Sequence, residues 1–417
     1  MRSTHRRGRI LGALSSFAVG ALLLAGCTGG DSVPSPDKIS NPMPDDVVEQ
    51  MQSATERAIT AGGGPGAIVG VWAPWIGEWE AGVGETEPGS GTAPSTDMTF
   101  RAATVTRSMT CDLLYAMDGG AVNLDDPVTA YLQSVPQLTD VTLVDLCNGV
   151  SGLRSSRDAN WNFVIGNPDR QWDPREYAAS GLGAGRGSTD SWSDSDTSFF
   201  LLGLALQNAS HTSLGELYNQ HIFDPQNLEH TYLPSDAPST AGNNPLPGFY
   251  SSSKVQSNSC SEPPSDVSEL SASYGYADSG VVSSVTDLRD YVSRQARSAG
   301  TSEDLAPRWS EMFPVSSDGE QWVRAGGGNR LNGSMLGQEG DILGYGVAAY
   351  SDIDTGLTVV VVLNNSAGGG TLAGALAREL SAIAMEAPGD DAPETTLPWT
   401  ADQAHDAVAS AAKCPID

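Results

Sequence analysis

The chain places strand-like hydrophobic runs near both ends and a mostly helical stretch between them. Residues 45–61 carry apolar positions at helical spacing after an acidic first turn, and residues 67–75 and 77–85 predict a pair of strands. The other predicted elements are helices at 103–120, 281–296 and 372–387 and strands at 321–327, 345–352 and 357–365. This order indicates one α/β sandwich whose sheet is completed late in the chain and encloses a helical insertion.

Composition supports a folded, acidic protein. The chain has 417 residues, of which 39% are hydrophobic and 18% charged, so it can bury a core and differs from disordered sequences. Its 51 acidic side chains outnumber 22 basic ones, giving a net charge of −29. Binding to phosphate backbones draws on clustered Lys and Arg, so nucleic acid is excluded as the main partner.

The first 26 residues have the layout of a secretory signal. Four arginines within residues 1–9 precede an apolar run at 10–24, and the segment ends in Leu24-Ala25-Gly26-Cys27. This ending resembles a bacterial lipobox, which implies cleavage before Cys27, a lipid on its thiol, and an extracytoplasmic protein anchored to the cell membrane. The alternative is an ordinary signal peptide with an incidental Cys27. Removing the leader takes the net charge to −33, and residues 27–44 predict a flexible tether.

Four further cysteines remain if Cys27 is lipidated. They are Cys111, Cys147, Cys260 and Cys414. An exported compartment permits disulfides and the even number fits two bridges, but spacing alone leaves all three pairings open. Four buried free thiols are the alternative.

The segment Phe100 to Ser108, FRAATVTRS, resembles the stretch around the nucleophile in serine β-lactamases of class C type and their D-alanyl-D-alanine carboxypeptidase, penicillin-binding-protein and esterase relatives. Further landmarks of this superfamily follow in order at 124–132, 151–153, 197–203, 223–231 and 278–288. The resemblance covers residues 45–387 and leaves 388–417 as a C-terminal extension with a short helix. It implies an α/β (α+β sandwich) fold of the β-lactamase/transpeptidase type, with an antiparallel sheet flanked by helices and a mostly helical subdomain.

The family's chemistry uses a Ser-x-x-Lys, a Tyr-x-Asn and a Lys/His-x-Gly motif. Each motif can be located here, with other residues in most of its positions. Thr104 and Arg107 occupy the Ser and Lys positions, Asp194 and Asp196 the Tyr and Asn positions, and Gln338 and Gly340 the Lys/His and Gly positions. Of these six residues, Gly340 alone is the one that the family uses.

These replacements weaken the case for hydrolysis. A guanidinium stays protonated at any working pH, so Arg107 cannot serve as a general base, and the Gln338 amide neither titrates nor carries positive charge. Guanidinium groups pair well with carboxylates. We therefore expect Arg107 to be held by Asp194, Asp196 or both; the alternative is that the two carboxylates face solvent.

The resemblance also favours one disulfide pairing. In this fold the helix that carries the first motif is central, and Cys147 precedes a turn that lies near it, which favours a bridge to Cys111. The second bridge then joins Cys260 in an irregular loop to Cys414 near the end of the chain, where it ties down the tail.

The sequence thus predicts a lipid-anchored envelope protein with a degenerate β-lactamase-related domain, acting as a non-catalytic binding or scaffolding protein. Its expected partners are the membrane and a peptide, a peptidoglycan fragment or an envelope protein. No cofactor is expected, and the five histidines show no metal-ligand spacing. Two alternatives remain: an active β-lactamase, D-amino-acid peptidase or esterase using Thr104, and a rigid spacer that presents an acidic surface.

Overall fold

The computed structural model describes residues 39, 41–235, 240–301, 307–317, 319–389 and 392–416. The chain divides into two units, Met1–Ser32 and Val33–Asp417, and every described residue belongs to the second. The expected leader, Cys27 and most of the tether lie outside the described residues. Within the described ranges, no helix combines the length and apolar character needed to cross a membrane.

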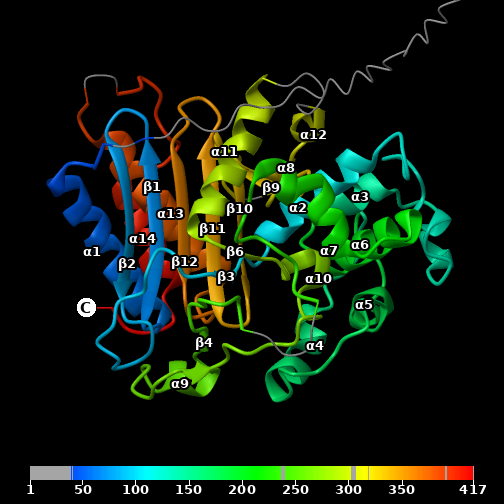
Figure 1. The fold of residues 1–417 in the computed structure, drawn as a ribbon, viewed down its shortest axis with the longest axis horizontal. Helices are drawn as coiled ribbons and strands as arrows, with labels where there is room; N and C mark the ends of the chain where they lie inside the picture. Colours follow the sequence, from blue (N-terminus) through cyan, green and yellow to red (C-terminus); the bar gives the residue numbers. More distant parts are fainter. Residues whose placement is uncertain are drawn as a thin grey trace, which may run out of the picture. The chain divides into compact units, whose positions relative to one another are not determined.

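An eight-stranded antiparallel sheet forms the centre of the second unit (Figure 1), in the order β2-β1-β12-β11-β10-β9-β8-β7. The N-terminal hairpin therefore pairs with the last strand, with Val69 opposite Val361, so the sheet is completed late in the chain. Its strands are β1 (Gly66–Ala73), β2 (Gly77–Gly84), β7 (Phe313–Pro314), β8 (Val323–Gly326), β9 (Asn329–Asn332), β10 (Met335–Ile342), β11 (Tyr345–Asp352) and β12 (Thr358–Leu363). Two short ladders pair β3 (Phe100–Arg101) with β6 (Val282–Ser283) and β4 (Phe249–Tyr250) with β5 (Ser265–Asp266).

Helices cover both faces of this sheet. α1 (Asp45–Gly62), α13 (Gly369–Glu386) and α14 (Ala401–Ala411) pack together on one face, and α11 (Val285–Thr301) packs against the other. The remaining helices belong largely to the insertion between β3 and β6, which Figure 1 shows in cyan and green. They are α2 (Val105–Met117), α3 (Leu143–Asn148), α4 (Arg157–Gly166), α5 (Pro174–Gly183), α6 (Asp196–Ser210), α7 (Leu214–Tyr218), α8 (Asp224–Gln226), α9 (Ser253–Ser257), α10 (Tyr276–Ser279) and α12 (Pro307–Ser310), with short helical turns at Val128–Ala130, Pro136–Leu138 and Asn219–Phe223.

The two faces of the sheet bury separate hydrophobic clusters. On β1, Ile68 and Trp72 belong to the cluster on the side of the helical insertion, whereas Val69 and Val71 belong to the cluster with α1 and α13. Alternate side chains of a strand point to opposite faces. Because both faces are covered, β1 is a continuous hydrophobic run with every residue buried.

Two disulfides connect Cys111 with Cys147 and Cys260 with Cys414, which is the pairing that the resemblance favours. The first joins the middle of α2 to α3, four residues after Arg107. The second lies beside α1, where Lys413 and Cys414 both donate backbone hydrogen bonds to the carbonyl of Ala61.

Prolines lie at both edges of the sheet. Pro42 forms an isolated bridge with Glu78 of β2, and the flanking backbone bonds run from Met43 N to Glu78 O (3.1 Å) and from Glu78 N to Asn41 O (2.8 Å). At the opposite edge, β7 consists of two residues and ends at Pro314.

Candidate functional site

The first motif lies where β3 passes into α2. Ala103 has a φ of 49°, a left-handed conformation that is uncommon for a residue with a side chain and that clusters at functional sites. Thr104 follows as the residue before α2 and is 7% exposed. Its hydroxyl donates a hydrogen bond of 2.9 Å to the carbonyl oxygen of Glu339.

Strand β10 brings the third motif against Thr104. A Cβ atom added at Gly340 would lie 1.9 Å from Thr104 Oγ1, so only glycine allows this approach. The Gln338 amide is turned to another partner, since its Nε2 donates to the carbonyl of Gly328 at 2.9 Å. The strand thus places Gly340 against the threonine hydroxyl, with the Gln338 amide engaged elsewhere.

Arg107 lies in the first turn of α2 and is held by two carboxylates from outside this helix. Its Nε donates to Asp278 Oδ1 at 2.7 Å, and its Nη1 forms an ion pair with Asp194. The guanidinium also lies over the Phe199 ring, 5.0 Å from the centroid. Burial lowers the pKa of Arg107, but the two carboxylates outweigh burial and leave that pKa raised.

The two carboxylates around Arg107 respond differently. The positive charge of Arg107 lowers the pKa of Asp194, whose side chain is 61% exposed. Burial raises the pKa of Asp278 to about 6, and the negative charge of Asp196 adds to this effect, while Arg107 opposes it. The expected pairing of Arg107 with Asp194 is present, and Asp278 is a second partner that the sequence analysis missed.

Asp196 does not pair with Arg107. It is the first residue of α6 and is 4% exposed. Its Oδ1 accepts hydrogen bonds from Ser155 Oγ (3.0 Å), from the backbone N–H of Ser156 (2.7 Å) and from its neighbour Thr197 N (2.7 Å). The second motif therefore contributes one carboxylate to Arg107 and one to the start of a helix.

Further charged pairs line the same cleft and were not foreseen. Arg157 forms a bidentate ion pair with Asp341, which follows the third motif. Glu339 lies 3.6 Å from Arg330 and 3.5 Å from Arg378. The cleft between these groups has a volume of about 140 Å³ and is lined by residues of all three motifs.

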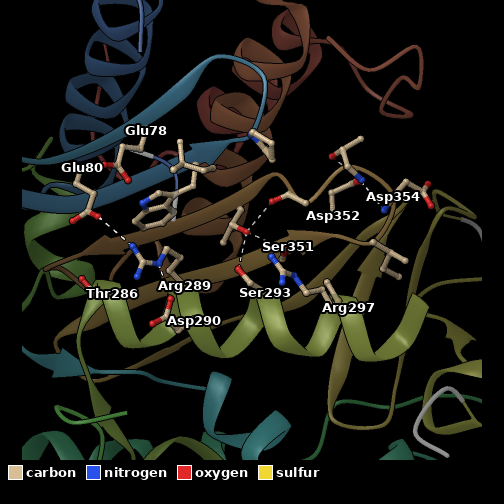
Figure 2. Close-up of a pocket in the computed structure, with 18 of the residues that line it drawn as sticks. Glu78, Glu80, Thr286, Arg289, Asp290, Ser293, Arg297, Ser351, Asp352 and Asp354 are labelled. Atoms are coloured by element: carbon tan, nitrogen blue, oxygen red, sulfur yellow. Dashed lines mark hydrogen bonds and ion pairs between the residues drawn. The ribbon is translucent and has the colours of Figure 1, made fainter. Parts of the chain in front are cut away.

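A second, larger cavity lies beside α11 and shares no residue with this cleft. Its volume is about 870 Å³. Figure 2 shows Arg289 between Glu80 and Asp290, and its guanidinium lies over the Trp72 ring at 5.3 Å from the centroid. Burial raises the pKa of Glu80. Three hydroxyls of this cavity bond to one another, Ser293 to Thr358 (3.0 Å) and Ser351 to Thr358 (2.9 Å), while the Thr355 hydroxyl donates to the Asp352 carboxylate (2.9 Å).

Among the described residues, no group of three or more His, Cys, Asp or Glu side chains is arranged to hold a metal ion.

The model of the Beta-lactamase family matches residues 51–383, and the chain therefore belongs to the β-lactamase family. This places it in the serine β-lactamase and penicillin-binding-protein-like superfamily, with the mixed α/β fold expected from the resemblance.

Solved structures with this fold include amidases and a penicillin-binding protein homologue. A D-stereospecific amidohydrolase from Streptomyces sp. has a TM-score of 0.66 and 22% identity, covering 78% of this chain and 96% of that one. A D-amino acid amidase from Ochrobactrum anthropi SV3, complexed with L-phenylalanine amide, has a TM-score of 0.62 and 20% identity, covering 77% and 92%. An octameric penicillin-binding protein homologue from Pyrococcus abyssi has a TM-score of 0.64 and 17% identity, covering 84% and 79%. At sequence identities of 17–22%, this similarity shows a shared fold and no more.

Proposed function

We propose that this protein is a lipid-anchored envelope protein whose β-lactamase-type cleft binds a ligand without hydrolysing it. The observation that carries the proposal is the state of Arg107. A general base must be able to lose its proton near the nucleophile, and a guanidinium whose pKa is raised by two carboxylates cannot do so.

The other two motifs give the same indication. Asp194 stands where the family has a tyrosine, and its negative charge is neutralised by Arg107. The Gln338 side chain donates to a backbone carbonyl and brings no positive charge to the cleft. The Thr104 hydroxyl in turn donates its hydrogen bond to the backbone carbonyl of Glu339, which cannot take up a proton as a general base. A hydroxyl without a neighbouring base is a weak nucleophile.

The ligand class follows from what the fold accommodates in related proteins. The D-amino acid amidase of similar fold was solved with L-phenylalanine amide. A peptide or a peptidoglycan fragment presents comparable amide groups, and such a ligand would be available to a protein held at the outer face of a membrane.

The test for hydrolytic chemistry is a search for a covalent adduct. The full-length protein is incubated with a β-lactam or a fluorophosphonate and its intact mass and peptide masses are measured. We expect no mass increase on the peptide that contains Thr104. An adduct there in the wild type, absent in Thr104→Ala, would contradict the proposal.

The same adduct would support the second candidate, an active hydrolase. The observation in its favour is the preserved setting of Thr104, which follows a left-handed residue and lies against Gly340 as a family nucleophile would.

The anchor is tested separately. Growth with an alkyne-labelled fatty acid should label the wild-type chain and leave Cys27→Ser unlabelled, and the variant should leave the membrane fraction. Equal labelling of both chains would exclude Cys27 as the lipid-bearing residue.

A further inference from the structure

The cavity of about 870 Å³ beside α11 is a groove whose floor is formed by the sheet. The floor is one row of cross-strand partners, which runs from Glu78 of β2 through Trp72 of β1 and Thr358 of β12 to Ser351 of β11. Direct cross-strand partners point to the same face of a sheet, and all four side chains line the cavity. Because neighbouring strands lie about 4.8 Å apart, this row extends over about 14 Å.

One face of α11 forms the wall of this groove. The helical residues that line it recur every three or four positions and therefore share one side of the helix. They are Thr286, Arg289, Asp290, Ser293, Ala296 and Arg297. At about 1.5 Å per residue, the helix rises about 16 Å from the first of them to the last. Wall and floor are thus of similar length, and we call this elongated cavity the α11 groove.

The α11 groove carries more negative than positive charge. Five carboxylates and two guanidinium groups line it. Arg289 already lies 3.9 Å from Glu80 and 2.8 Å from Asp290. Burial raises the pKa of Glu80, Arg289 opposes this shift, and the negative charge of Glu78 adds to it. A cation that entered the groove would therefore be attracted, and an anion would be repelled.

Two of these carboxylates are free to meet a ligand. Within the described ranges, the side chains of Glu78 and Asp354 form no hydrogen bond or ion pair, and both residues are at least partly exposed. Glu78 lies at the β2 end of the floor, and Asp354 lies in the turn that follows β11 at the other end. Figure 2 shows them on opposite sides of the groove. A ligand that meets both must carry positive charges spaced along its length.

We propose that the α11 groove binds an extended, basic segment of a partner protein, with lysine or arginine side chains directed to Glu78 and Asp354. An extended chain advances about 3.3 Å per residue, so a groove about 14–16 Å long holds four or five residues. The inference goes beyond the proposed function, because this groove shares no residue with the cleft.

A peptide suits the groove better than other cationic ligands. Its carbonyl groups can accept hydrogen bonds from the Asn41 amide and the Thr286 hydroxyl, which line the groove and have no side-chain hydrogen bond to the described residues. A polyamine offers no acceptor to these groups. A divalent metal ion requires several oxygen ligands, and no such cluster occurs in the described part of the chain. A second copy of this protein, with a net charge of −29, would be repelled.

The first test asks whether the wild-type protein binds a short basic peptide through its charges. Binding of pentalysine amide to the full-length chain is measured by isothermal titration calorimetry at pH 7 and low ionic strength, beside the same peptide with every lysine Nε-acetylated. We expect saturable binding of pentalysine and at least tenfold weaker binding of the acetylated peptide. Equal affinities, or no saturable binding of pentalysine, would overturn the proposal.

The second test locates the binding and separates it from general attraction to an acidic protein. Glu78→Gln with Asp354→Asn removes the two free charges of the groove. Glu87→Gln with Asp158→Asn removes two charges at exposed positions outside the groove and is the matched control. We expect at least fivefold weaker pentalysine binding in the first double variant and less than a twofold change in the control. An equal loss in both, or no loss in the first, would overturn the proposal.

The third test fills the groove without changing its charge. Thr286→Trp places a large side chain on the α11 wall, and it should weaken pentalysine binding at least fivefold with an unchanged circular dichroism spectrum. Full affinity in a folded Thr286→Trp protein would overturn the proposal, and the charge variants decide the matter if this variant fails to fold.

Spermine distinguishes a peptide site from a polyamine site. We expect it to bind the wild type more weakly than pentalysine does. Tighter binding of spermine that is lost in Glu78→Gln with Asp354→Asn would overturn the assignment to a peptide. None of these outcomes depends on hydrolysis in the cleft, so the adduct experiment on Thr104 remains a separate test of the proposed function.

Discussion

The Nε of Arg107 donates a hydrogen bond of 2.7 Å to Asp278, across 171 residues of sequence. Both side chains are about nine-tenths buried, at 11% and 9% exposure. The pair therefore joins α2 to α10 at the position where the family places its general base. This pair should affect both the stability of the folded protein and the ability of residue 107 to act as a base.

The buried position of Asp278 predicts a specific pH dependence. Its pKa is about 6 in the folded protein against 3.8 for the free side chain, so between these values the folded state binds more protons than the unfolded state. The free energy of unfolding contributed by this group therefore falls as the pH rises from about 4 to about 6. Asp278→Asn should remove this fall. Urea unfolding of the wild type and of Asp278→Asn at pH 4.5 to 7.5 gives the difference between their free energies of unfolding at each pH. A difference that stays constant across that range would contradict the raised pKa of Asp278.

Removing the cation of the pair should be strongly destabilising. Arg107→Met leaves Asp278 buried without a counter-charge, and breaking a buried pair in this way costs about 3–5 kcal/mol. The matched control is Arg175→Met, because Arg175 pairs with Asp173 at the surface, where such pairs contribute about 0–1 kcal/mol. Denaturant midpoints of the two variants provide the comparison. A loss in Arg107→Met no larger than in Arg175→Met would show that the buried pair is not a stabilising contact.

If the cleft binds without hydrolysis, as proposed, gaining hydrolysis should require several changes together. Thr104→Ser, Arg107→Lys, Asp194→Tyr and Gln338→His place family residues at four of the five replaced motif positions and leave Asp196 where the family has asparagine. Thr104→Ser alone should leave turnover of a chromogenic β-lactam or nitrophenyl ester at the background rate, and recovery from that single change would contradict the role given to Arg107.

Asp278 adds a further requirement to this restoration. A lysine at position 107 would lie beside the Asp278 carboxylate, which favours the protonated amine and so opposes its action as a base. We therefore expect the four-residue variant to gain activity when Asp278→Ala is added. If Asp278→Ala instead lowered the activity of the four-residue variant, the Asp278 carboxylate would be assisting the reaction.

The disulfide between Cys111 and Cys147 should contribute substantially to stability. It closes a loop of 36 residues, for which the chain-entropy relation gives about 4 kcal/mol, with measured values of typically about 2–4 kcal/mol. Cys111→Ala with Cys147→Ala should lower the free energy of unfolding by this amount. The wild-type protein under reducing conditions is the control, since reduction should remove the difference between the two proteins. A persistent difference would assign the effect to packing at the two sites.

The spacing of apolar residues predicted those elements in which this spacing is regular, either helical or strand-like. The helix predicted at 45–61 is α1 at Asp45–Gly62, and the strand predicted at 345–352 is β11 with the same bounds. Strand β10 was not among the elements that periodicity predicted. It carries Glu339 and Asp341, which are ion-paired, and glycines that allow close contact with Thr104 and α13, so its sequence lacks a hydrophobic pattern.

The candidate site was predictable as far as motif alignment extends. The alignment located Arg107 and Asp194, and a cation beside a carboxylate made their pairing a reasonable expectation. Asp278 and the pair of Arg157 with Asp341 depend on contacts across 171 and 184 residues, which no local pattern encodes. The burial of Asp196 Oδ2 without a hydrogen-bond partner among the described residues likewise follows only from the packing around it.

The prolines at the two sheet edges affect whether a second chain can add a strand to this sheet. A free edge strand offers unpaired backbone groups to a second chain, and proline removes one donor from that row. Here Pro42 and its neighbours already occupy the outer side of Glu78 in β2, and the two-residue β7 ends at Pro314. Aggregation by strand addition is disfavoured at both places, so crowded copies of the protein can remain separate.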